Sequence, residues 1–170
     1  MKRITIFALA VTVLAVAPMA IAADTAAKDS TLGVTVGPEA SFTAVDTTTA
    51  LTKSDTVFGA YGGTTNFTYK IRTTKVGGTG TITVMVTTFG TGGPAVADLS
   101  FVNTAPTSGT PVTTSAVAST TVAGAVVGFG ADAHSADAGD SGTTVWTLAD
   151  RTGIKTGDYS STATFTIAAL

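Results

Sequence analysis

Runs in which apolar residues alternate with threonine, serine or glycine recur along most of this 170-residue chain. In one of them Phe67, Tyr69 and Ile71 alternate with polar neighbours. Successive side chains of a β-strand point to opposite faces of a sheet, so a period of two predicts strands with one buried face. Threonine and valine are β-branched and suit strands, whereas glutamate, lysine and glutamine, which build surface helices, are scarce. No strand pattern alternates with a helical one, so we expect an all-β protein.

The turn signals between these runs predict about seven to nine strands in one domain, arranged as an Ig-like antiparallel β-sandwich. Strands are expected at 31–37, 41–45, 66–72, 81–87, 96–102, 143–148 and 159–167. The segment 112–129 is interpreted as one or two strands broken near Gly124, with a helix as the alternative. The pair Gly77-Gly78 lies between the runs 66–72 and 81–87, and this arrangement predicts that the two runs form a hairpin.

The N-terminus has the three-part pattern of a secretory signal peptide. Lys2 and Arg3 precede an uncharged, mainly apolar run at 4–17, and Ala20-Ile21-Ala22 offers the small residues that signal peptidase requires. The run is shorter than the roughly 20 residues that a membrane-spanning helix needs. We therefore expect residues 1–22 to be cleaved, with an uncut N-terminal membrane anchor as the alternative.

Cleavage would leave residues 23–170 as a single secreted β-sandwich domain without a membrane span. Residues 23–30 are polar and small and have no period, so we expect a mobile arm there. The formal net charge of −2 becomes about −4 once the two N-terminal cations are removed, so nucleic acid is not an expected partner. Cysteine is absent, which excludes thiol catalysis, cysteine-bound zinc and iron–sulfur clusters.

One loop gathers several side chains that could carry chemistry. It holds the single histidine, His134, and the carboxylates of Asp132, Asp137 and Asp140. These carboxylates and the loop carbonyls could supply the roughly six to eight oxygens that calcium takes, but their spacing is not that of a helix–loop–helix calcium site. An exposed polar turn is the alternative, because aspartate and glycine favour turns. No G-x-S-x-G motif accompanies the histidine, and we expect no enzymatic activity, no catalytic residue and no cofactor.

Two sets of side chains could contact a ligand. Lys70, Arg72 and the nearby Lys75 form a basic stripe that could meet an acidic polysaccharide or wall polymer, or could be a solvated strand face that discourages edge pairing. Trp146 could stack on sugar rings together with the three tyrosines of the chain. The alternative is that Trp146 is a core residue whose N–H finds a hydrogen-bond partner.

The C-terminal run from Gly157 to Ile167 resembles the last strand of fimbrial subunits of the chaperone–usher type, in which a glycine precedes an alternating strand that a chaperone grips. This resemblance implies assembly roles for Gly157, Tyr159, Phe165 and Ile167. Separately, Trp146-Thr147-Leu148 is similar to the W-x-L signature of bacterial cell-wall-binding WxL domains. Both resemblances imply a bacterial surface protein with an Ig-like sandwich outside the cytoplasm.

Together these features predict a secreted, non-enzymatic surface protein, a subunit of a fibre or coat that assembles by strand addition. In this prediction Leu32, Val34 and Val36 leave their own domain and complete the sheet of another copy in a homopolymer. The alternative for this segment is the first strand of its own sandwich. The alternative function is a monomeric module that binds a cell-wall polymer or another glycan.

Overall fold

The structure is a computed structural model that describes residues 28, 30–104, 108–111, 113 and 115–170. The expected signal peptide at 1–22 lies outside the described residues, as does the expected arm at 23–30 except for Lys28 and Ser30. The chain divides into two units, Met1–Val34 and Thr35–Leu170. The fold below is that of the second unit.

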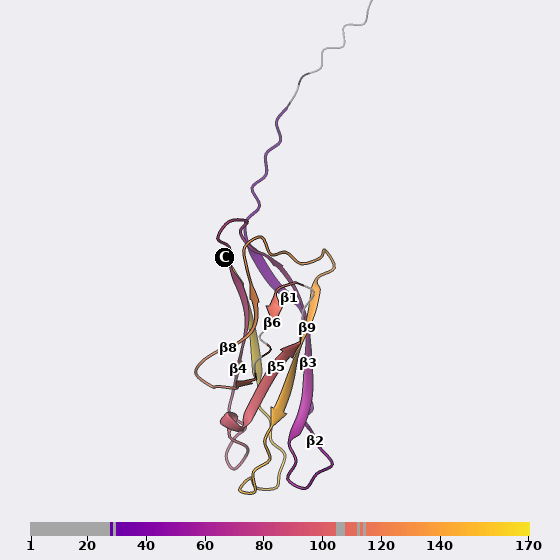
Figure 1. The fold of residues 1–170 in the computed structure, drawn as a ribbon, viewed down its shortest axis with the longest axis vertical. Helices are drawn as coiled ribbons and strands as arrows, with labels where there is room; N and C mark the ends of the chain where they lie inside the picture. Colours follow the sequence, from indigo (N-terminus) through magenta and orange to yellow (C-terminus); the bar gives the residue numbers. More distant parts are fainter. Residues whose placement is uncertain (1–27, 29, 105–107, 112, 114) are drawn as a thin grey trace, which may run out of the picture. The chain divides into compact units, whose positions relative to one another are not determined.

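In the described residues the second unit forms ten β-strands and one short 3₁₀ helix (Figure 1). Their bounds are β1 Glu39–Val45, β2 Thr52–Lys53, β3 Tyr61–Arg72, β4 Gly80–Val86, η1 Val96–Asp98, β5 Leu99–Thr104, β6 Thr110–Pro111, β7 Ala116–Val117, β8 Gly124–Phe129, β9 Asp140–Leu148 and β10 Ala163–Ala169. The all-β prediction is confirmed, and the helix considered for 112–129 is absent from the described part of that segment. The count exceeds the predicted seven to nine because β2, β6 and β7 are two-residue strands.

The strands form two antiparallel sheets that pack against each other. The larger sheet has the order β1-β3-β9-β5-β7, with β2 paired to β3 outside this path. The smaller sheet has the order β10-β4-β8-β6. The first strand, β1, and the last strand, β10, therefore each lie at the end of a sheet. Loops connect the long strands at both ends of the unit (Figure 1).

The core lies between the sheets and is built from alternate residues of the long strands. The buried apolar residues of β3 and β4 are Phe67, Tyr69, Ile71, Ile82, Val84 and Val86. Aromatic rings fill the space between them and the remaining strands; the rings of Phe101 and Trp146 have centroids 5.4 Å apart. The expected face of each of these strands is the buried one, so the period of two predicted the core correctly here.

The runs 66–72 and 81–87 do not form a hairpin, and that prediction is wrong. They belong to β3 and β4, which lie in different sheets. The backbone of the connecting residues bonds elsewhere: Thr73 N donates to the Ala133 carbonyl at 2.9 Å, and Thr79 N to the Leu170 carbonyl at 3.2 Å. Two strands that each have one apolar face can bury those faces side by side in one sheet or opposite each other across a core. Alternation alone does not distinguish the two arrangements.

Several strand limits differ from the predicted ones. The run 96–102 splits into η1 and β5, and the run 143–148 is extended at its start to Asp140. The run 159–167 becomes β10, which is shifted toward the C-terminus. The prediction at 31–37 is wrong, because that segment forms no strand and β1 is the first strand of the unit.

Candidate functional site

Residues 31–37, called the N-terminal segment below, expose an alternating row of apolar side chains. Leu32 is 94% exposed, Val34 87% and Val36 58%. The residues have the spacing i, i+2 and i+4, so they would form one apolar face if the segment joined a sheet. The segment forms no strand, so it is not the first strand of its own sandwich. Its addition to the sheet of another copy stays a prediction.

The chain is held by side-chain contacts where it enters β1. Nε of Arg72 donates to the carbonyl of Gly37 at 3.0 Å, and Nη2 of Arg72 lies 2.8 Å from Oε2 of Glu39. Both contacts are exposed, so they contribute little to stability. They fix the position at which the chain departs from the edge of the larger sheet.

β1 and β10 lie beside each other at one side of the second unit. Within the described residues β1 pairs with β3 alone, and β10 pairs with β4 alone. Phe165 and Ile167 of β10 are only partly buried, whereas their partners on β4, Val84 and Ile82, are fully buried. This side therefore combines two sheet edges, which have backbone groups available for pairing, with an incompletely covered core.

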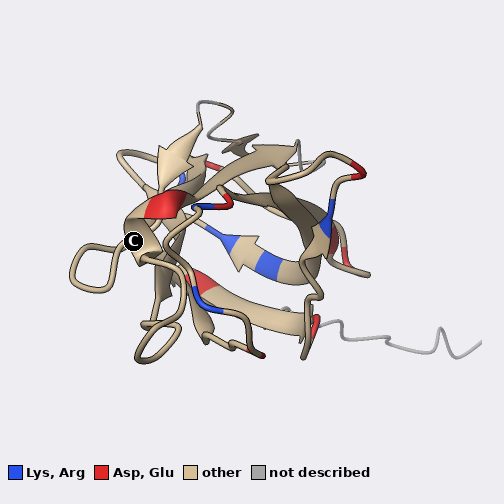
Figure 2. Cartoon of the chain, turned by 90° about the horizontal axis from the view of Figure 1, so that it is seen from below, with Lys and Arg blue, Asp and Glu red and all other residues tan. Residues whose placement is uncertain are grey.

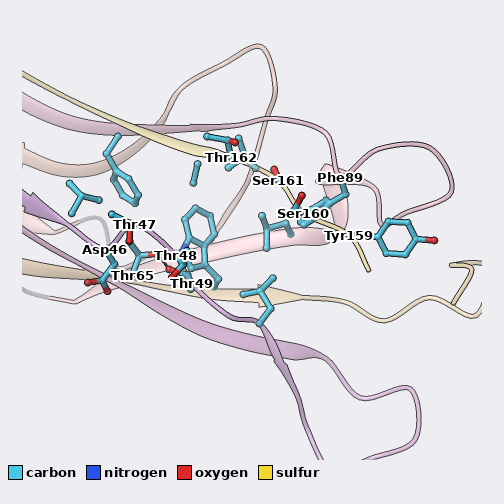
Figure 3. Close-up of a pocket in the computed structure, with 17 residues that line it drawn as sticks. Asp46, Thr47, Thr48, Thr49, Thr65, Phe89, Tyr159, Ser160, Ser161 and Thr162 are labelled. Carbon is cyan, nitrogen blue, oxygen red and sulfur yellow. Dashed lines mark hydrogen bonds between the residues drawn. The ribbon is translucent and has the colours of Figure 1, made fainter. Parts of the chain in front are cut away.

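A cavity of about 350 Å³ opens on the same side, and we call it the edge cavity (Figure 3). It lies between the segment that follows β1 and the segment that precedes β10. The apolar part of its lining is Val45, Leu51, Val86, Phe89, Leu99, Trp146 and Phe165. The hydroxyl-bearing part is Thr47, Thr48, Thr49, Thr65, Ser160, Ser161 and Thr162. An apolar floor with a hydroxyl rim beside an unpaired strand can accept the side chains of an additional strand.

Trp146 belongs to the floor of this cavity and is 4% exposed. Its indole N–H is bonded to the side chain of Thr65, so the polar atom of the ring is satisfied inside the protein. Trp146 is thus a core residue whose N–H has found a partner, as the alternative expected. Contact of Trp146 with a ligand stays a prediction.

The C-terminal residues predicted for assembly fall into two groups. Phe165 and Ile167 lie in β10, whereas Gly157 and Tyr159 lie in the irregular chain before it. Regular pairing is interrupted next to β10, where Thr162 N donates to the hydroxyl of Thr87 at 2.8 Å instead of to a backbone carbonyl. Only the second half of the predicted run therefore has the strand geometry that the resemblance implies.

The loop that was considered for calcium is organised around an inward-pointing carboxylate. Asp140 is buried, accepts a short hydrogen bond from the Ser108 hydroxyl and accepts another from Ala136 N at 3.4 Å. His134 instead forms a bridge opposite Arg72, with Nδ1 3.0 Å from the carbonyl of Asp132. No group of three or more acidic or histidine side chains that could hold a metal occurs in the described parts of the chain. Asp132, Asp137 and Asp140 thus are not brought together as metal ligands.

Lys70 and Arg72 lie on the outer face of β3, as the alternation predicted. Arg72 is engaged by Glu39, so it is not an isolated positive charge. Positive and negative residues are scattered over the unit rather than collected on one face (Figure 2). Lys75 lies in the turn after β3, so only Lys70 and Arg72 of the predicted stripe share the outer face of that strand.

The hydroxyl-bearing residues of the edge cavity were missed by the sequence analysis. Thr65 is the clearest case, since it is buried and bonded to both Thr49 and the core tryptophan. Nothing in its sequence context separates it from the other threonines of a threonine-rich chain. Its role depends on Thr49 and Trp146, which only the fold brings next to it.

Comparisons with known proteins give no family for this chain: no protein-family model, no curated protein and no solved structure matches it. Among the residues that the structure describes, no helix has both the length and the apolar character needed to cross a membrane.

Proposed function

We propose that this chain is a secreted, non-enzymatic structural subunit with an Ig-like sandwich, which forms a fibre or coat on the bacterial surface. The N-terminal segment of one copy adds as a strand to the unpaired edge of β10 in another copy. The observation that carries this proposal is the exposure of Leu32 and Val34, at 94% and 87%, in a segment whose alternation matches a strand. The leader at 1–22 supports export, because its pattern is that of a cleaved signal.

The proposed donor and acceptor have compatible lengths. β10 has seven residues, from Ala163 to Ala169, and the alternating N-terminal segment at 31–37 has the same length. Pairing along β10 would place the apolar face of the donor over the partly buried Phe165 and Ile167. The residues beyond that pairing would meet the edge cavity, whose floor is apolar.

The energetic support comes from burial and from main-chain bonding. Fully burying one leucine or valine side chain contributes about 1.5–3 kcal/mol, and the segment offers three such side chains. Strand addition also gives partners to the backbone N–H and C=O groups of the β10 edge. A copy that has not accepted a donor has both an exposed apolar segment and an unpaired strand edge. Such an edge is a template for pairing with another chain.

The proposal is tested with the exported full-length protein on gels run without boiling. The wild-type chain is expected to give SDS-resistant ladders, and the double variant Leu32→Asp/Val34→Asp is expected to lose them. The matched control is Val76→Asp/Val122→Asp, which places the same charges at two exposed valines outside the segment. A wild-type chain that stays monomeric, or ladders that survive the first double variant, would overturn the proposal.

Engineered cysteines locate the acceptor, because the natural chain contains none. Thr35→Cys in one copy is mixed with Thr164→Cys or Thr166→Cys in another, since these β10 threonines lie on the exposed face of the strand. Side chains directly opposite each other on neighbouring strands are close enough to form a disulfide. Cross-links between copies are expected at β10. Cross-links that form instead with Ser41→Cys on β1 would assign the acceptor to the other edge.

A further inference from the structure

A second cavity, of about 670 Å³, lies at one end of the unit, where β2 and two loops meet. We call it the loop cavity. Its lining includes residues from the loop 54–60, from β3 and from the loop 149–162 that precedes β10. Four aromatic rings face it, those of Phe58, Tyr61, Phe89 and Tyr159. Phe89 and Tyr159 also line the edge cavity and mark the boundary between the two (Figure 3).

Phe58 is held in an unfavourable backbone conformation at this site. Its φ is 55°, in the left-handed region that bulky residues rarely adopt, and its side chain is 57% exposed. The surrounding loop is closed by two backbone hydrogen bonds, Ser54 N to Ala60 O at 3.0 Å and Gly59 N to Thr56 O at 2.9 Å. Backbone strain of this kind persists only where the surrounding structure enforces it, and strained residues are common at ligand-binding sites. Here the enforced conformation presents an aromatic ring to solvent at the mouth of a cavity.

A lysine lies close to two of these rings. Nζ of Lys53 lies 5.6 Å from the ring centroid of Phe58 and 5.6 Å from that of Tyr61. The same ammonium group lies 2.8 Å from Oδ2 of Asp150. The rings therefore lie beside an ion pair, which offers both a hydrogen-bond donor and an acceptor to a ligand.

The opposite side of the cavity is also ordered. The hydroxyl of Tyr159 donates to the carbonyl of Lys155 at 3.0 Å, and the ring packs over Gly93, where a Cβ atom would lie 2.5 Å from the ring. Nη2 of Arg151 is held 2.9 Å from Oδ1 of Asp98. Aromatic rings and charged groups with partners within the protein thus occur on both the 149–162 loop and the β2–β3 side of the cavity.

We propose that the loop cavity binds a saccharide, a short stretch of a surface polysaccharide or oligosaccharide. A pyranose ring has an apolar C–H face, which packs on an aromatic ring, and a rim of hydroxyls, which bond to carboxylate and ammonium groups. Small-molecule sites combine apolar and aromatic side chains with convergent polar groups, and the lining of the loop cavity contains both kinds within a volume of the same order. The charged rim disfavours a wholly apolar ligand, because its groups would lose water without gaining partners.

The loop cavity shares Phe89 and Tyr159 with the edge cavity, so saccharide binding and strand addition have to be measured separately. A surface subunit that also carries such a site would attach its assembly, or the cell, to a glycan. The binding test therefore includes the assembly variant Leu32→Asp/Val34→Asp, which is expected to bind saccharide as well as the wild-type chain does. Loss of assembly and loss of binding are in this way separate results.

The test is an NMR titration of the mature full-length chain with four soluble probes: cellotetraose, chitotetraose, mannotetraose and tetragalacturonate. We expect saturable shifts of loop-cavity resonances with at least one probe, and at least a roughly tenfold weaker affinity for Phe58→Asn. Asparagine tolerates the left-handed backbone, so this variant removes the ring without adding strain. The control Val57→Asn changes the neighbouring exposed residue and is expected to keep the wild-type affinity.

Two results would overturn the proposal. One is the absence of saturable shifts with all four probes up to about 20 mM, a concentration that would detect even weak binding. The other is saturable binding that Phe58→Asn leaves unchanged, since the ligand would then lie elsewhere. Circular dichroism of each variant verifies that the comparison is made between folded proteins.

Discussion

The indole Nε1 of Trp146 on β9 donates a 2.8 Å hydrogen bond to Oγ1 of Thr65 on β3, and the same oxygen lies 2.6 Å from Oγ1 of Thr49. This chain of bonds ties the core tryptophan to the irregular segment that follows β1. It also satisfies a buried indole N–H at the floor of the edge cavity. A threonine that looks ordinary in the sequence is thus the polar centre of this side of the core.

Replacing that threonine should therefore destabilise the fold. Thr65→Val keeps the shape of the side chain but leaves the indole N–H without its acceptor, which is expected to cost about 1–3 kcal/mol of unfolding free energy. Urea denaturation followed by tryptophan fluorescence measures the loss. Thr64→Val, at an exposed position next along β3, serves as the control and should stay within about 0.5 kcal/mol of the wild type. Equal effects of the two variants would contradict the role assigned to Thr65.

Two glycines in paired strands should respond differently to alanine. A Cβ atom at Gly142 on β9 would lie 2.7 Å from the ring of Phe67, whereas one at Gly62 on β3 would have the Trp146 carbonyl, at 3.9 Å, as its nearest neighbour. Gly142→Ala is expected to lower the free energy of unfolding by about 1–3 kcal/mol through overpacking. Gly62→Ala should be neutral or slightly stabilising, since alanine also restricts the unfolded chain. Thermal denaturation of both variants tests this, and a Gly142→Ala variant as stable as the wild type would show that the ring can move away.

Alkaline pH should weaken the core through Tyr69. Burial raises the pKa of its hydroxyl, and the negative charge of Asp140 raises it further. The folded state thus favours the neutral phenol, so this stabilisation is complete below the unfolded pKa of about 10 and is lost as pH rises from there through the folded-state pKa. We expect the denaturation midpoint to fall above about pH 10, and to fall less steeply in Tyr69→Phe. If the denaturation midpoint fell with pH equally steeply in both proteins, Tyr69 would not be the cause of the alkaline destabilisation.

The exposed N-terminal segment should not contribute to the stability of a single copy. Leu32→Ser is expected to change the unfolding free energy of the monomer by less than about 0.5 kcal/mol. Ile82→Ala, a truncation of a fully buried side chain on β4, should cost about 2–5 kcal/mol in the same assay. The measurement is equilibrium denaturation at concentrations where size-exclusion chromatography gives only monomer. A large loss for Leu32→Ser would mean that the residue packs within its own copy.

The buried faces of the long strands could be predicted because alternation is a local property. Phe67, Tyr69 and Ile71 are alternate residues of one strand and point to the same face, so burial of one of them implies burial of the others. Which strands become neighbours depends on distant parts of the chain. β4 pairs with β10 and β8, and no pattern within 66–87 contains that information.

The candidate sites were predicted only in part for the same reason. The alternating apolar row of Leu32, Val34 and Val36 is visible in the sequence, since its three members are near neighbours. The loop cavity brings together Tyr61 and Tyr159, which are far apart in the sequence. It also includes Phe58, whose left-handed backbone conformation no sequence pattern predicted. Trp146 was ambiguous until the fold placed it in the core.

The position of β10 as the last strand sets an order on how this molecule can become complete. Leu170 donates to the Thr79 carbonyl at 2.7 Å, directly after β10 pairs along β4. The smaller sheet therefore lacks one edge strand until residues 163–169 have been synthesised. A chain that stops before β10 leaves Val84 and Ile82 without the strand that pairs beside them, and unpaired edges of this kind make incomplete chains prone to aggregation. Synthesis through β10 is in this way a precondition for a closed hydrophobic interior.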